Sequence, residues 1–293
     1  MKKWLRWAIG AGSSALLVAL LAAAVYRSYG PGELAERIER LQRRWSPFVG
    51  NEAPVIWKFI ANGVWITVQI AMISIALSLV FGLVLALMRL ARNRQLRPSA
   101  PAGLLAAIAA PATALVQIVR ASPLYMLIIY SFIAAPRLGV NLSPMQAGIF
   151  ALTLYTSCVL AEIMRAGILS LDRGQFEASA ALGLSYLNRL RLVILPQGLR
   201  RMVPAVVSQL VTLIKDTSLL SFITVLEVNR RLSILSQQRF NPIESLLVAA
   251  LIYFAINFTL STLASRLEER PVKAAAGTPA VQAVGSEDQT RLA

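Results

Sequence analysis

Long runs of apolar residues dominate the chain, and short charged stretches separate them. Residues 59–88 carry no charged side chain. Further runs with few charges cover residues 8–25, 104–136, 145–167, 202–226 and 245–264. Each of these reaches roughly the 18 residues that a membrane-crossing helix needs. Because the bilayer core offers no water to backbone groups, a chain with this pattern crosses as helices. The pattern predicts an all-α polytopic membrane protein with about six transmembrane helices.

These runs divide the chain into four predicted domains. Residues 1–26 form an N-terminal transmembrane anchor; a cleaved signal peptide is the alternative, but its apolar core is usually shorter. Residues 27–58 form an external amphipathic segment that lies at the membrane interface. A docking surface for an external partner is the second interpretation of that segment. Residues 59–267 form the transmembrane domain. Residues 268–293, rich in alanine, glycine and polar residues, form a disordered cytoplasmic tail.

The run at residues 104–136 is long enough for one crossing or for a tight hairpin. Lysine and arginine concentrate in loops on the cytoplasmic side of a membrane. A single crossing places most of the basic residues on the cytoplasmic side, as this rule requires. A hairpin places most of them on the external side, against the rule. We therefore expect one crossing, both termini in the cytoplasm and residues 168–201 on the cytoplasmic side.

Composition excludes several classes of function. The chain is 57% hydrophobic and carries a net charge of +15. The arginines are scattered among the ends of apolar runs, which indicates topology signals beside anionic lipid rather than a nucleic-acid surface. Histidine is absent and Cys158 is the single cysteine, so no metal site is expected. An intramembrane enzyme would need paired catalytic groups that the sequence does not offer, so we expect no enzyme activity.

The stretch at residues 173–197 predicts a helix, a turn and a second helix. Residues 176–182 favour a helix that Gly183 ends in a left-handed conformation. Ser185 caps the second helix, although Asn188 replaces the Glu or Gln of a full capping box. Leu195–Pro196 is expected to end that helix.

The second helix is expected to be amphipathic. Leu187, Leu190 and Ile194 recur at a spacing that places them on one face. Arg189 and Arg191 then lie off that face. Such a helix would bury its leucines and leave its arginines in water.

Residues of this stretch resemble the EAA motif of ABC importer permeases. The matching positions are Glu177, Ala178, Ser179, Gly183, Val193, Leu195 and Pro196. Ser179 departs from the third alanine and Val193 from an isoleucine, and both changes are conservative. The stretches RASPL (120–124), AEIMRAGI (161–168) and KDTSL (215–219) are similar to the polar amino-acid branch, of histidine or glutamine type.

The resemblance implies a type I importer permease, with a core of five helices plus one extra N-terminal helix. It further implies a bacterial inner-membrane importer of polar or charged amino acids. Its partners would be a cytoplasmic ABC ATPase dimer, an external solute-binding protein and a second permease, either another copy or a relative. An ion-coupled secondary transporter or channel is the alternative, but no inverted repeat is visible in the sequence.

The sequence contains no phosphate-binding loop. That loop requires a lysine directly after a glycine, and no lysine here follows one. ATP and magnesium are therefore expected on the partner chains, with no cofactor on this one. The EAA-like stretch would then be the place where the effect of ATP enters.

Charged and hydroxyl residues within the apolar runs are candidates for the substrate path, because charges in a membrane usually face a bundle interior or a pathway. They are Arg120, Ser122, Glu162, Arg165, Lys215, Asp216, Thr217 and Ser218. Glu162 and Arg165 are three residues apart and can instead form a structural ion pair. Arg120 can instead extend to the membrane interface, beside a helix broken at Ser122–Pro123. Residues 215–218 can hold both ends of an amino acid or pair with neighbouring helices.

Overall fold

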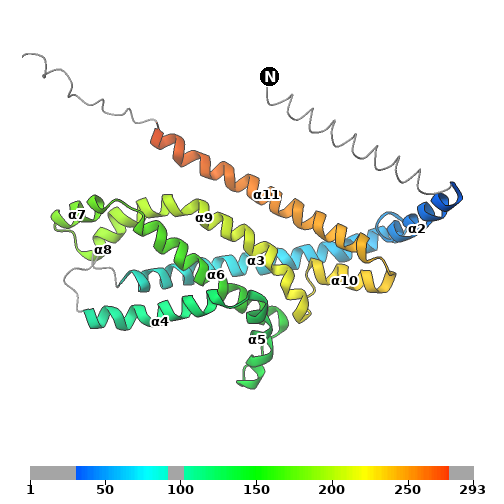
Figure 1. Ribbon diagram of the computed structural model, residues 1–293, viewed down its shortest axis with the longest axis horizontal. Coiled ribbons are helices and arrows are strands. Elements are labelled where there is room, and N and C mark those ends of the chain that lie inside the picture. The colour runs from blue at the N-terminus through cyan, green and yellow to red at the C-terminus, as the bar shows by residue number, and fades with distance from the viewer. Residues whose placement is uncertain (1–30, 92–101, 277–293) are drawn as a thin grey trace, which may run out of the picture. The chain divides into compact units, whose positions relative to one another are not determined.

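The computed structural model describes residues 31–91 and 102–276, and every regular element within these ranges is helical (Figure 1). The elements are α2 (Pro31–Val49), α3 (Ala53–Leu90), α4 (Ala102–Ala121), α5 (Leu124–Arg137), α6 (Pro144–Leu169), α7 (Arg173–Ala181), α8 (Tyr186–Arg189), the π-helix η1 (Leu190–Ile194), α9 (Leu195–Asp216), the 3-10 helix η2 (Thr217–Ile223), α10 (Val228–Arg239) and α11 (Pro242–Ala276). The all-α prediction is confirmed for this part of the chain. The predicted anchor at residues 1–26 lies outside the described residues.

Four helical stretches among the described residues are long and apolar enough to cross a membrane. They are Ala53–Leu90, Pro144–Leu169, Leu187–Ile223 and Pro242–Thr262. A fifth candidate is the bent pair formed by Ala106–Ala121 and Leu124–Arg137. These five candidates coincide with the five apolar runs that follow residue 58.

The predicted interruption at Ser122–Pro123 is a sharp bend of 107° between α4 and α5 (Figure 1). Pro123 adopts an extended backbone, so α4 ends before it and α5 begins after it. This geometry lies between the straight crossing and the hairpin that the sequence allowed. Pro111 of the same apolar run lies inside α4. Proline is tolerated within membrane helices where local adjustments satisfy the freed backbone group.

The expectation that Leu195–Pro196 ends the second helix of the loop is wrong. The chain continues from α8 through η1 into α9, with Pro196 in the first turn of α9. The Leu195 N–H donates to the Leu190 carbonyl, five residues back, which is the bond of a π-turn. Proline normally clashes with the carbonyl four residues before it. The wider turn makes room for the ring, so the helix passes through.

The predicted tail begins later than expected. Residues 268–276, which include Pro271, continue α11 as helix. The rest of the tail lies outside the described residues.

The described residues belong to two compact units, and α3, α10 and α11 contribute to both. The smaller unit contains residues up to 60 together with residues 232–247. Its aromatic centre joins α2 to the start of α3: Trp57 packs against Phe48 and donates its indole N–H to the Phe48 carbonyl at 2.9 Å. Within the predicted external segment, residues 31–49 are helical as α2, whereas the position of this helix at a membrane interface stays a prediction.

The larger unit, which among the described residues covers 61–91, 102–231 and 248–276, is organised around α6. This helix packs against α4, α5, α9 and η2, and twelve of its residues are buried. Gly82 of α3 permits a close approach to α6, since a Cβ at this position would lie 2.9 Å from the Leu160 Cβ. The end of α6 leads directly to the EAA-like element.

Candidate functional site

The EAA-like element begins with α7, which is capped and docked by its own residues. The Asp172 side chain accepts a hydrogen bond from the Gly174 N–H at 2.8 Å and so caps the helix. Phe176 is 3% exposed and packs in a core cluster with Leu90 of α3 and Ile168 of α6. The α7 helix is therefore attached through one aromatic side chain to the ends of two membrane-crossing helices.

The turn after α7 has the predicted geometry. Gly183 adopts φ +69°, a left-handed conformation that costs other residues about 1–2 kcal/mol. No atom lies within 4 Å of the position a Cβ would take, so the backbone angle rather than space selects glycine. The Ser185 hydroxyl accepts from the Asn188 N–H at 3.4 Å, as expected of the cap.

The seven motif residues divide into an exposed group and a packed group. Glu177 and Ala178 are exposed on α7, whereas Ser179 is 2% exposed and donates its hydroxyl to the Phe176 carbonyl. Val193 and Leu195 are half-buried against the same core cluster as Phe176. The element thus presents an acidic and alanine-rich face while its other side holds the ends of the membrane helices.

The predicted amphipathic face of the second helix is partly wrong. Leu190 and Ile194 are buried, but Leu187 is 70% exposed. Arg189, expected in water, is buried and donates to the Leu184 carbonyl at 3.4 Å. The α8 helix is a single turn, and none of the described helices covers Leu187.

Three of the candidate path residues meet in one ionic cluster. Glu162 accepts hydrogen bonds from Arg165, as the three-residue spacing predicted, and from Arg89 of α3. Arg120 at the end of α4 lies 3.9 Å from the same carboxylate. The Arg89 side chain is 10% exposed and that of Arg120 is 45% exposed. One carboxylate therefore joins α3, α4 and α6.

The other candidates lie apart from this cluster. Ser122 donates its hydroxyl to the Ile118 carbonyl within its own chain segment. Lys215 and Asp216 end α9, and Thr217 and Ser218 begin η2. This junction lies near the C-terminal end of the long span Leu187–Ile223. Lys215 is exposed, Asp216 is half-buried, and Thr217 is buried with its hydroxyl bonded to the Ile214 carbonyl at 2.7 Å.

A second buried carboxylate was missed by the sequence reasoning. Glu227 is fully buried and accepts hydrogen bonds from the Asn229 and Arg230 backbone N–H groups and from the Tyr253 hydroxyl, at 2.7–2.8 Å. It therefore caps the start of α10 and connects it to α11. Burial raises the pKa of Glu227, although these hydrogen bonds oppose the rise. The available signal was an acidic residue directly before the polar stretch at residues 228–239, because carboxylates favour helix N-termini.

The arrangement offers a docking face, a set of helices attached to it and a polar junction farther along the span. Among the described residues no group of histidine, cysteine and carboxylate side chains could hold a metal ion. The exposed face of α7 can contact another protein, and a displacement there would reach α3 and α6 through Phe176.

Comparison with known proteins identifies the family. Residues 99–273 match the family described as the binding-protein-dependent transport system inner membrane component. A probable glutamine ABC transporter permease protein of Bacillus subtilis is 40% identical over 228 residues, covering 76% of this chain and 98% of the relative. A glutamate transport system permease protein of Corynebacterium glutamicum is 34% identical, covering 78% of this chain and 79% of the relative.

Solved structures share the fold. The crystal structure of an amino acid ABC transporter with histidines matches with a TM-score of 0.65 and 26% identity, over 73% of this chain and 94% of that one. An inward-facing methionine ABC transporter matches with a TM-score of 0.63 at 20% identity, over 74% and 97%. The chain belongs to the family of inner membrane components of binding-protein-dependent transport systems.

Proposed function

We propose that this chain is the permease subunit of an ATP-driven importer of polar amino acids of the glutamine or glutamate type. The observation that carries the proposal is the α7–Gly183–α8 element, which is docked onto membrane-crossing helices and exposes Glu177 and Ala178. The names of the relatives support the substrate class. This chain supplies the pathway and the connection to the energy source, and it carries out no covalent chemistry.

The proposed partners are those expected from the sequence. A pair of ABC ATPase subunits binds ATP and magnesium and contacts α7, on the cytoplasmic side with both termini of this chain. An external solute-binding protein delivers the amino acid from the other side. The second permease is another copy or a relative. The ATPase motion is transmitted through Phe176 to α3 and α6, and through the continuous helix of α8, η1 and α9 to the junction at residues 215–218.

We place the substrate path at this junction. Lys215 and Asp216 offer opposite charges, and Ser218 offers a half-buried hydroxyl in the next turn. An amino acid presents an ammonium and a carboxylate, so both ends can be held there. For Arg120, Glu162 and Arg165 the ion-pair geometry supports a structural role. The bond from Ser122 to its own segment supports the same role for that residue.

A matched pair of glycine variants tests the coupling role. Gly183 and Gly139 both have positive φ, and neither has an atom within 4 Å of a Cβ position. Gly183→Val strains the turn after α7 by about 1–3 kcal/mol, whereas Gly139→Val applies the same strain far from the element. We expect Gly183→Val to reduce ATPase co-purification or amino-acid uptake by the reconstituted importer, and Gly139→Val to leave both unchanged.

Glu177→Lys provides the second arm, because it reverses the charge of the exposed face without straining the backbone. It should uncouple ATP hydrolysis from uptake. Two results together would contradict the proposal and favour an ion-coupled transporter. They are the absence of an ATPase from the purified chain and uptake that is unaffected by both Gly183→Val and Glu177→Lys.

A further inference from the structure

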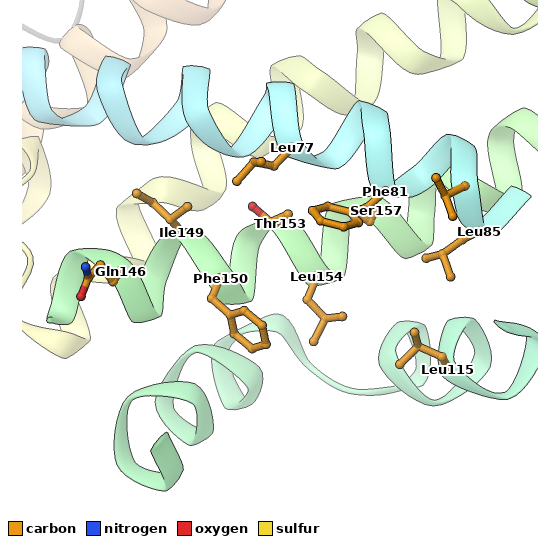
Figure 2. Close-up of a pocket in the computed structure, with 11 residues that line it drawn as sticks. Leu77, Phe81, Leu85, Leu115, Gln146, Ile149, Phe150, Thr153, Leu154 and Ser157 are labelled. Atoms are coloured by element: carbon orange, nitrogen blue, oxygen red, sulfur yellow. The ribbon is translucent and has the colours of Figure 1, made fainter. Parts of the chain in front are cut away.

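An apolar groove runs along three of the membrane-crossing helices in the larger unit (Figure 2). Its volume is about 470 Å³. Figure 2 shows Leu77 and Phe81 of α3 opposite Thr153 and Ser157 of α6, with Leu115 contributed by α4. Phe81 and Phe150 are both more than half exposed at its edges. A groove of this kind in a membrane protein opens toward the hydrocarbon of the lipid or toward another subunit.

The arginine cluster lies on the same three helices, beyond the end of the groove nearest α7. Arg89 follows the lining residue Leu85 by one helical turn, and Glu162 follows Ser157 by little more than one turn. Three guanidinium groups share the single Glu162 carboxylate, so the cluster remains positively charged. Arg120 is the most exposed of the three and the farthest from the carboxylate.

We propose that the groove and the cluster together bind one anionic phospholipid from the leaflet on the α7 side. The acyl chain lies in the groove and the phosphate lies beside Arg120, whose half-exposed guanidinium makes only a 3.9 Å contact with Glu162 and can bind the phosphate bidentately. Basic pockets between membrane helices bind anionic headgroups in this way.

A second copy of the chain fits this face less well. Subunits of a symmetric pair present the same surface to each other. Within a membrane both clusters would lie at the same depth, so the pair would bring like charges together. A phospholipid instead offers an apolar tail and a negative phosphate in the order that the groove and the cluster require.

Native mass spectrometry of the full chain in detergent tests the headgroup. The chain is stripped of lipid and titrated with phosphatidylglycerol or phosphatidylcholine that carry the same acyl chains. We expect phosphatidylglycerol to bind more tightly, because the cluster repels the choline cation of phosphatidylcholine. Arg120→Gln removes a contact to the phosphate that both lipids carry, so it should weaken phosphatidylglycerol about five-fold and phosphatidylcholine less, which narrows the preference. Arg120→Lys should retain the preference, and Arg200→Gln, which removes an exposed arginine of α9, should have no effect. Equal binding of the two lipids, or no effect of Arg120→Gln, overturns the proposal.

Filling the groove tests the acyl chain. Leu115 is 39% exposed, and Leu115→Trp adds volume at the lining without a new charge. Both lipids should then bind more weakly, whereas Leu251→Trp at an exposed position of α11 leaves them unchanged. If Leu115→Trp instead separates a pair of chains and leaves lipid binding intact, the groove is an interface between copies and the proposal fails.

Discussion

Glu162 and Glu227 are both carboxylates in the larger unit, but their partners differ in kind. Glu162 faces the guanidinium groups of Arg89, Arg165 and Arg120. Glu227 accepts hydrogen bonds from neutral groups, namely two backbone N–H groups and the Tyr253 hydroxyl. The first connects three membrane helices near α7, and the second connects the start of α10 to α11.

The difference teaches what each site can do. Removing the carboxylate from an ionic cluster leaves buried positive charge without compensation, which costs more than the pair itself contributes. A carboxylate held by neutral donors can lose its charge by protonation while most of its surroundings stay in place. The ion pairs of Glu162 therefore hold α3, α4 and α6 together permanently, whereas the strength of the hydrogen-bonded contact at Glu227 depends on pH.

The largest effect is expected from Glu162→Gln. It removes the charge that compensates Arg89, whose side chain is 10% exposed, and should lower the free energy of unfolding by about 3 kcal/mol. Thermal unfolding of the purified protein in detergent measures the loss. Arg165→Gln, at a side chain that is 30% exposed, should cost less because water compensates part of the change. An equal loss in both variants would contradict the central role of the carboxylate.

The hydrogen bond between Tyr253 and Glu227 should contribute less. Tyr253→Phe leaves a buried carboxylate with one donor fewer, at a cost of about 1.5 kcal/mol. A double-mutant cycle with Glu227→Gln should give a coupling energy of about 1 kcal/mol. Tyr130→Phe is the matched control, since Tyr130 is 65% exposed and should be neutral. Additive losses in the cycle would show that the two side chains act independently.

The comparison also shows which contacts a sequence can predict. The pair of Glu162 and Arg165 was predictable because three residues of helix determine it. Arg89 lies 73 positions from Glu162, and Tyr253 lies 26 positions from Glu227. Those contacts depend on how helices pack against each other, which the local spacing of residues along the sequence does not show.

The same limit applies to the backbone. The turn at Gly183 and the helices at the five apolar runs after residue 58 agree with the sequence predictions, because a left-handed turn and a helix of sufficient length depend on local chemistry. The two prolines at 123 and 196 looked alike in sequence, yet one bends the chain by 107° and the other lies in a continuous helix. The π-turn before Pro196 makes the difference, and nothing in the local residue types required it.

A smaller effect is expected from pH, and it separates the two carboxylates directly. The pKa of Glu227 is raised above its ordinary value of 4.5, mainly by burial. At a pH between 4.5 and the raised pKa of the folded state, Glu227 has lost its proton in the unfolded chain but keeps it in the folded chain. The free energy of unfolding therefore falls as pH rises through this range. Unfolding free energies measured from about pH 4 to about pH 8 should show this fall. Glu227→Gln should abolish it, whereas Glu33→Gln on the exposed first turn of α2 should not. A fall that persists in Glu227→Gln would assign the pH dependence to another group.

The smallest effect is expected at an exposed carboxylate, where a charge partner is present but burial is not. Glu36 and Arg40 of α2 lie 3.7 Å apart, with side chains 76% and 63% exposed. Glu36→Gln should change the free energy of unfolding by less than about 0.5 kcal/mol, and added salt should remove even that difference. The variant is measured beside Glu162→Gln in the same detergent. Similar losses of unfolding free energy in the two variants would mean that the charge of the arginine alone determines the loss. The expected several-fold difference means that the burial of the arginine determines it.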